Sequence, residues 1–195
     1  LANVRPTMQQ ELTQKKWQER YDAIQKGVAR VGQTLAEASP DVLVMLGADI
    51  SEQFLTDNMP TVCVYTGDTI TGSIGAGEGA KQADYPVASD LAKHLLGSMS
   101  DEKVDVVPAR YLPGKEGLGI SFAFVHQRIM GIKPIPTVPI TQNFFYPRDA
   151  NASDSAYELG HSIKRGIASW GHDAKVAVIG IGGLSHFVIN EELDR

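Results

Sequence analysis

The stretch Asp41–Gly47, which reads DVLVMLG, decides the fold. It places five apolar residues in succession, without the alternation expected of a strand that has one face in water. A continuous apolar run of this length indicates a strand that is buried on both faces. Strands of this kind occur where helices cover both sides of a largely parallel sheet.

Other segments on either side of this run support that architecture. Glu11–Ala38 carries apolar residues every three or four positions, which predicts a long amphipathic helix that Pro40 ends. Further strands are predicted in TVCVYTG (61–67), VDVVPARYL (104–112), KPIPTVPI (133–140) and KVAVIGIGG (175–183), and further helices in 86–97, 121–130 and 151–170. The alternation predicts an α/β fold: a mostly parallel or mixed sheet flanked by helices, in a single domain over residues 1–195.

Two segments carry less regular patterns. The prolines of 133–140 predict a strand near an edge of the sheet or one followed by a sharp bend. Residues 67–84 contain five glycines and no apolar period, so we expect a long flexible loop there, such as an active-site lid.

Composition excludes several classes of protein. A net charge of -5 and a pI near 5.5 argue against binding to nucleic acid or to an anionic membrane. The single cysteine, Cys63, lies in an apolar run and reads as a small buried hydrophobe, which excludes an internal disulfide framework. The chain opens without a signal-peptide pattern, so we expect a cytoplasmic location. It also starts without Met and stops in what reads as the first turn of a helix, so we expect it to lack N- and C-terminal segments.

The candidate site residues follow the predicted strands. In open α/β sheets, ligands bind beyond the carboxyl ends of the strands. His186 follows a glycine pair there and can exchange protons near neutral pH. Asp49 could bind a metal, cap the next segment or hold a loop, while Asn143 and Tyr146 could orient a phenolic or carboxylate substrate or form a turn. The remaining histidines are expected to be surface or hydrogen-bonded residues: His94, His126, His161 and His172.

Several collinear segments resemble the class III extradiol ring-cleavage dioxygenases, the family typified by the catalytic subunit of protocatechuate 4,5-dioxygenase. They include DVLVMLGADISEQF (41–54), RYLPGKEGLGISFAFVHQRIMG (110–131), IPTVPITQNFFYP (135–147) and KVAVIGIGGLSHFVINEELD (175–194). The resemblance implies a non-haem Fe(II) enzyme in which two histidines and one glutamate hold the metal and leave room for a catechol-type substrate and O2. It identifies His186 as the acid–base residue, with Gly183 and Ser185 beside the substrate. It also implies a small aromatic substrate and a homo-oligomer or a second subunit.

The sequence departs from the family pattern at the metal. Ile50 occupies one ligand position, and Ile120 occupies the position of a second active-site histidine that is not an iron ligand. The other two family ligands would lie before Leu1 and beyond Arg195, which leaves Asp49 as a weak substitute ligand. Three hypotheses therefore stay open. The favoured one is a ring-cleaving dioxygenase, and the others are a non-catalytic structural subunit and an iron-independent enzyme that uses His186 on an aromatic or keto acid.

Overall fold

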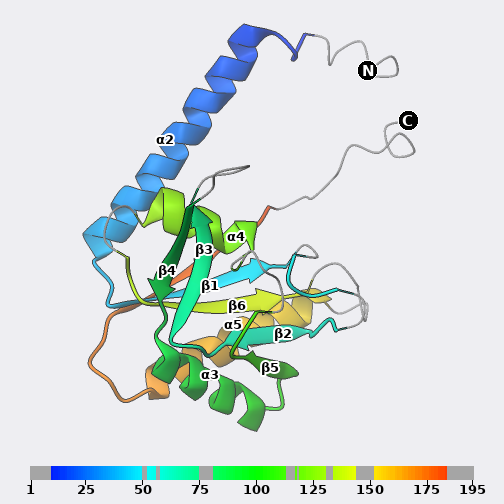
Figure 1. The fold of residues 1–195 in the computed structure, drawn as a ribbon, viewed down its shortest axis with the longest axis vertical. Coiled ribbons are helices and arrows are strands. Elements are labelled where there is room, and N and C mark those ends of the chain that lie inside the picture. Colours follow the sequence, from blue (N-terminus) through cyan, green and yellow to red (C-terminus); the bar gives the residue numbers. More distant parts are fainter. Residues whose placement is uncertain are drawn as a thin grey trace.

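The computed structural model describes residues 10–49, 52–55, 58–74, 81–112, 117, 119–130, 134–143 and 152–183. The elements in chain order are α2 (Gln14–Ala38), β1 (Val42–Ala48), β2 (Val62–Tyr65), β3 (Thr69–Ile74), β4 (Lys81–Pro86), α3 (Ser89–Asp101), β5 (Val106–Ala109), α4 (Ile120–Phe124), the π-helix η1 (Val125–Ile129), β6 (Thr137–Gln142), α5 (Ala152–Ser169) and β7 (Val176–Gly180). Within these residues a five-stranded mixed sheet, ordered β5-β2-β6-β1-β7, lies between two helical layers (Figure 1). The predicted α/β fold with a mixed sheet is therefore confirmed.

β1 is the strand that organises the sheet. It pairs in parallel with β6 on one side and with β7 on the other. Val42, Leu43, Val44 and Met45 are all buried, which confirms that both faces of this strand are covered.

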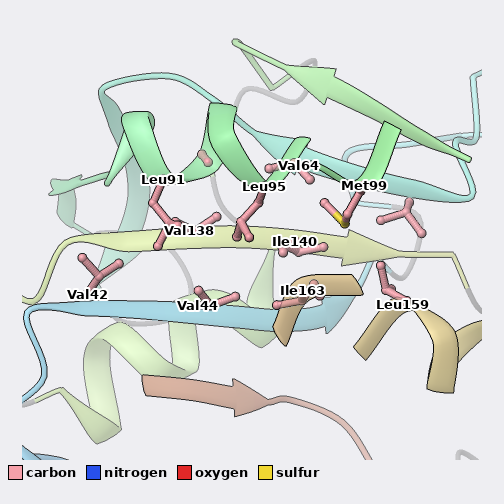
Figure 2. Close-up of a cluster of buried hydrophobic side chains, with 12 residues drawn as sticks. Val42, Val44, Val64, Leu91, Leu95, Met99, Val138, Ile140, Leu159 and Ile163 are labelled. Carbon is pink, nitrogen blue, oxygen red and sulfur yellow. The ribbon is translucent and has the colours of Figure 1, made fainter. Parts of the chain in front are cut away.

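The two faces of β1 contact different helical layers. Figure 2 shows side chains of α3 and α5 pointing onto Val42, Val44 and their neighbours on β6. On the other face, Leu43 and Met45 pack with residues of α4, η1 and the β3-β4 hairpin. Each fully buried aliphatic side chain stabilises the fold by about 1.5–3 kcal/mol, so the two clusters hold the sheet firmly between the layers.

β6 corrects one prediction from sequence. Its prolines predicted a position near an edge or a sharp bend after the strand. The position near an edge is wrong, because β6 lies in the middle of the sheet, between β2 and β1, and the segment 144–150 lies outside the described residues. The antiparallel register with β2 covers only Ile140–Gln142, so Pro139 lies just outside that ladder. In the parallel ladder with β1 only alternate residues donate an N–H, so a single proline is tolerated where its own N–H is not required.

The β3-β4 hairpin corrects a second prediction, because much of 67–84 is not a loop. β3 and β4 pair antiparallel from Thr69 opposite Pro86 to Ile74 opposite Lys81. Ile70, which is 2% exposed, anchors the hairpin in the core, and the Tyr65 hydroxyl donates to the carbonyl of Thr69 at 2.9 Å. Glycines mask the strand pattern in the sequence, while a few tertiary contacts are enough to order the ribbon.

α2 forms as predicted but has no buried residue. Thr13 caps its first turn by accepting the N–H of Lys16, and it ends at Ser39, which adopts a left-handed conformation with φ of 44°. Val28 and Leu35 pack against the core, whereas the N-terminal half of the helix extends away from the body (Figure 1).

The segment that follows the fifth strand is a short α-helix that widens into a π-helix. The N–H of Met130 donates to the carbonyl of Val125 at 2.9 Å, which closes the wider turn. The residues predicted for the inner face, Phe122, Val125 and Ile129, are all buried. None of the helices in the described ranges has the length and apolar character needed to cross a bilayer.

Candidate functional site

The carboxyl ends of β1, β6 and β7 meet at one edge of the sheet. The register sets Ala48 beside Gln142 and Leu46 beside Gly180. Asp49, Asn143 and the glycines that follow β7 therefore leave the sheet at this same edge, as we expected from parallel strands. The N–H of Ile181 extends the pairing by donating to the carbonyl of Leu46 at 2.7 Å.

α4 begins over this edge because the second-last residue of β1 is a glycine, Gly47. A Cβ on Gly47 would lie 3.1 Å from the ring of Phe122, so the absence of a side chain lets the ring settle on the strand. This contact brings the first residue of α4, Ile120, next to the loop that follows β1. The side chain of Ile120 is 63% exposed.

Asp49 holds the loop that follows β1. The residue is 4% exposed, and its Oδ1 and Oδ2 atoms accept the backbone N–H groups of Glu52 at 2.9 Å and Gln53 at 2.8 Å. Holding a loop was one of the roles considered for Asp49, and these two hydrogen bonds show it in that role. A buried carboxylate that accepts two backbone N–H groups is well satisfied and stabilises the turn.

Glu52 and Gln53 tie this loop to the start of α4. Oε1 of Glu52 accepts the backbone N–H of Ile120 at 2.8 Å, and Nε2 of Gln53 donates to the carbonyl of Gly117. Gly117 needs to be glycine, because its φ is +75° and a Cβ there would lie 1.9 Å from the carbonyl oxygen of Thr71. We call these two side-chain links the loop clamp.

The sequence reasoning did not find the loop clamp. A signal was present, since an acidic or amide residue three positions after a capping residue is the spacing of a capping box, here Asp49 followed by Glu52. The contact with residues about 65 positions away could not be read from that spacing.

A small cavity lies beneath the loop clamp. Its walls include Asp49, Gln53, Cys63, Phe122 and Thr141, and its volume is about 20 Å³. This is room for about one water molecule, far less than an aromatic acid requires. An aromatic ligand at this edge would therefore lie outside this cavity, on the open side of the loops.

Cys63 faces the same cavity as a neutral thiol. Burial, with a smaller contribution from the charge of Asp49, raises the pKa of Cys63 to about 12. A thiol that does not ionise near neutral pH is not activated as a nucleophile. The expected role as a small buried hydrophobe agrees with this environment.

His126 meets the expectation of a surface or hydrogen-bonded histidine only in part. It is 3% exposed, its Nδ1 lies 3.0 Å from the carbonyl oxygen of Phe122, and its Nε2 has no hydrogen-bond partner among the described residues. Its ring lies against that of Tyr85, with 3.9 Å between centroids. Burial lowers the pKa of His126 to about 4, so the imidazole is neutral at physiological pH. His94, in contrast, has the expected partners, because its Nε2 lies 3.0 Å from both the Gly166 carbonyl and the Ser169 hydroxyl.

The remaining predicted site residues are placed only in part. The backbone N–H of Asn143 donates to the carbonyl of Thr61 at 3.0 Å, and Gly183 is exposed just beyond β7. Tyr146, Ser185 and His186 lie outside the described residues, as does Ile50.

The described residues do not fit an iron centre by themselves. No group of three histidine, cysteine, aspartate or glutamate side chains able to hold a metal occurs among them. Asp49 is the one described residue that we considered as a substitute ligand, and both of its oxygens accept backbone N–H groups. A complete set of metal ligands would need residues outside the described ranges.

Comparison with known proteins relates the chain to ring-opening dioxygenases. Residues 4–194 match the family model described as the catalytic LigB subunit of aromatic ring-opening dioxygenase. Among curated proteins, 2,3-dihydroxyphenylpropionate/2,3-dihydroxicinnamic acid 1,2-dioxygenases are similar. The protein from Photorhabdus laumondii is 28% identical over 169 residues, the one from Rhodococcus sp. 27% over 170 and the one from Escherichia coli O81 24% over 169.

These matches cover 85–87% of this chain but only 50–51% of the relatives, so the chain spans about half the length of the proteins that it resembles. The family match itself extends over nearly every residue, from the N-terminal helix to the segment after β7. The chain therefore belongs to the family of the catalytic LigB subunit of aromatic ring-opening dioxygenases.

Proposed function

We propose that the protein opens the ring of a catechol- or gallate-type aromatic acid with O2, at the edge where β1, β6 and β7 end. The observation that carries the proposal is the family match over residues 4–194. The parallel ends of these strands support it, because they bring Asp49, Asn143 and Gly183 to one edge. The similar enzymes are named for 2,3-dihydroxyphenylpropionate and 2,3-dihydroxicinnamic acid, so dihydroxylated aromatic acids with a carboxylate side chain are the first substrates to test.

His186 is the proposed acid–base residue. An imidazole titrates near neutral pH, so it can take a proton from a substrate hydroxyl and return it to the product. Gly182 and Gly183 precede it and let the substrate approach the backbone closely. Asn143, Tyr146 and Ser185 are the further residues proposed to contact the substrate.

Fe(II) is the metal expected in this family, and it would polarise the diol and bind O2. Because the described residues do not fit an iron centre, the proposal requires ligands from other parts of the protein. Asp49 can contribute a ligand while it holds its loop, because each carboxylate oxygen accepts one backbone N–H and keeps a second lone pair. The question is decided by measuring bound iron directly.

The test is anaerobic reconstitution of the purified full-length protein with Fe(II), followed by removal of free metal. Bound iron and O2 uptake are then measured with 2,3-dihydroxyphenylpropionate, protocatechuate and gallate. We expect substrate-dependent O2 consumption that His186→Ala abolishes without loss of bound iron, while His172→Ala, at an exposed histidine, has no effect. Absence of both bound iron and O2 uptake would contradict the proposal.

A second candidate function is favoured by Ile120. At a position where the resemblance implies a polar active-site residue, the chain has an aliphatic side chain that is 63% exposed. Together with Ile50, which occupies a ligand position of the family, this observation favours an iron-independent enzyme that uses His186 for proton transfer on an aromatic or keto acid. Turnover that is insensitive to chelators and lost in His186→Ala identifies this function. Activity that appears only with Fe(II) excludes it.

A further inference from the structure

Glu52 joins the two segments that border the candidate site. Its Oε1 atom accepts the backbone N–H of Ile120 at 2.8 Å, and its Oε2 atom lies so close to Gly119 that a Cβ there would be 2.5 Å away. Glu52 is exposed, and its own backbone N–H is held by Asp49 in the loop after β1. Its carboxylate therefore lies against the start of α4, although 68 positions separate the two bonded residues in the chain.

The first turn of α4 receives its acceptor from another segment of the chain. Gly119 is the N-cap residue of this helix, and it has no side chain that could accept a free N–H there. The first N–H groups of a helix have no partner within the helix and carry partial positive charge, so a carboxylate oxygen is a suitable acceptor. Glu52 supplies that oxygen, and the position of Ile120 is thereby tied to the loop after β1.

The side chain that Glu52 positions is apolar and faces solvent. Ile120 is 63% exposed, and Phe124, one turn later on the same face of α4, is 42% exposed. Phe122, which lies between them in sequence, is buried against Gly47. An exposed apolar pair at an edge where ligands bind is typical of a surface that packs on a ligand. The ring of an aromatic substrate is such a ligand, and the cavity beneath the loop clamp is too small to hold it.

We propose that Glu52 is a positioning residue of the ring-opening site: it holds Ile120 against the loop after β1, and the substrate ring packs on the Ile120 side chain. The inference rests on the proposed function, because it needs an aromatic substrate at this edge. Glu52 acts through Ile120 and takes no part in the chemical step. Its loss should therefore weaken the binding of the substrate and of the transition state equally, which raises KM and leaves kcat unchanged.

The test is steady-state O2 uptake by the full-length protein after reconstitution with Fe(II), with the aromatic acid that gives the highest rate. Glu52→Ala removes the acceptor, so KM should rise about tenfold, the lower end of the effect of one lost methylene contact, while kcat stays within about twofold. Glu52→Gln keeps an amide oxygen as the acceptor, so KM should not rise. Glu37→Ala removes the same charge and one hydrogen bond from α2, and it should behave like the wild type.

A second measurement does not depend on turnover. Hydrogen exchange of the Ile120 amide should become faster in Glu52→Ala and stay slow in Glu52→Gln, because only the alanine variant lacks an acceptor for this N–H. Circular dichroism of each variant checks that the rest of the protein remains folded.

Three results would overturn the inference while the proposed function stands. The first is an active protein whose KM is the same in Glu52→Ala as in the wild type. The second is an equal rise of KM in Glu52→Ala and Glu52→Gln, and the third is an Ile120 amide whose exchange Glu52→Ala does not change. A wild type without turnover contradicts the proposed function itself, and the inference then falls with it.

Discussion

Replacing the buried His126 with leucine should remove a pH dependence of stability. In the folded protein its ring is shielded by Tyr85 and the core, and its Nε2 has no partner among the described residues. Leucine has a similar size and loses only the bond from Nδ1 to the carbonyl of Phe122. That carbonyl keeps the N–H of Val125 as a donor, so at pH 7.5 we expect the free energy of unfolding to change by no more than about 1 kcal/mol.

The magnitude follows from the lowered pKa. Burial takes the pKa of His126 from 6.5 in an exposed histidine to about 4, so between these values the unfolded chain binds a proton that the folded chain does not. Stability is therefore complete above about pH 6.5 and falls as the pH drops toward 4. At about 1.4 kcal/mol per pKa unit, the full loss is about 3 kcal/mol, which is a large part of the 5–15 kcal/mol that holds a typical domain together.

Urea unfolding followed by tryptophan fluorescence at pH 7.5 and pH 4.5 measures this loss. Between these pH values the free energy of unfolding should fall further in the wild type than in His126→Leu. The difference should be most of the full loss of about 3 kcal/mol. His172→Leu makes the same change at an exposed histidine and should behave like the wild type. Carboxylates such as Glu102, whose pKa Arg165 lowers to about 2, titrate equally in all three proteins and cancel. An identical pH dependence in wild type and His126→Leu would refute the reasoning.

Three further perturbations test the site. Asp49→Ala leaves two backbone N–H groups without their acceptor, so the free energy of unfolding in urea should fall by about 2 kcal/mol. Asp49→Asn should cost roughly half of that. No change in either variant would mean that the loop does not depend on this carboxylate. Gly117→Ala should destabilise the fold by more than about 2 kcal/mol, because the new Cβ meets the backbone of Thr71. Gly171 has a similar φ of +74° but open space around it, so Gly171→Ala should cost only about 1 kcal/mol. Equal effects of the two substitutions would contradict the clash. Cys63, with its pKa raised to about 12, should resist alkylation at pH 8 until the protein is unfolded in urea, and rapid labelling of the native protein would show that it is accessible.

The elements found from sequence are those with a strong local pattern. β1 needed only its continuous apolar run, and α2 and α5 needed only their helical period. The β3-β4 hairpin was missed because its ordering depends on Ile70 in the core and on Tyr65 from another strand. β6 was misplaced because a proline is excluded from a central strand only where its N–H would be needed, and that depends on which strands lie beside it.

The candidate site divides in the same way. That Asp49, Asn143 and Gly183 meet at one edge follows from the parallel strands, which the sequence pattern predicted. That Asp49 holds the loop after β1 with both of its oxygens could not be predicted from the sequence, because it depends on where the N–H groups of Glu52 and Gln53 lie. The sequence also did not predict that Nε2 of His126 has no hydrogen-bond partner among the described residues, because a histidine on a short helix is usually exposed or hydrogen-bonded.

The sequence by itself determined the α/β fold class, the strand that organises the sheet and the family, because hydrophobic period and collinear motifs are local properties of the chain. Only the tertiary structure decided how α4 meets the loop after β1. That arrangement depends on Gly47 receiving the ring of Phe122 and on the loop clamp of Glu52 and Gln53. Contacts of this kind join segments about 65 to 75 residues apart, and they form only once the sheet has brought those segments together.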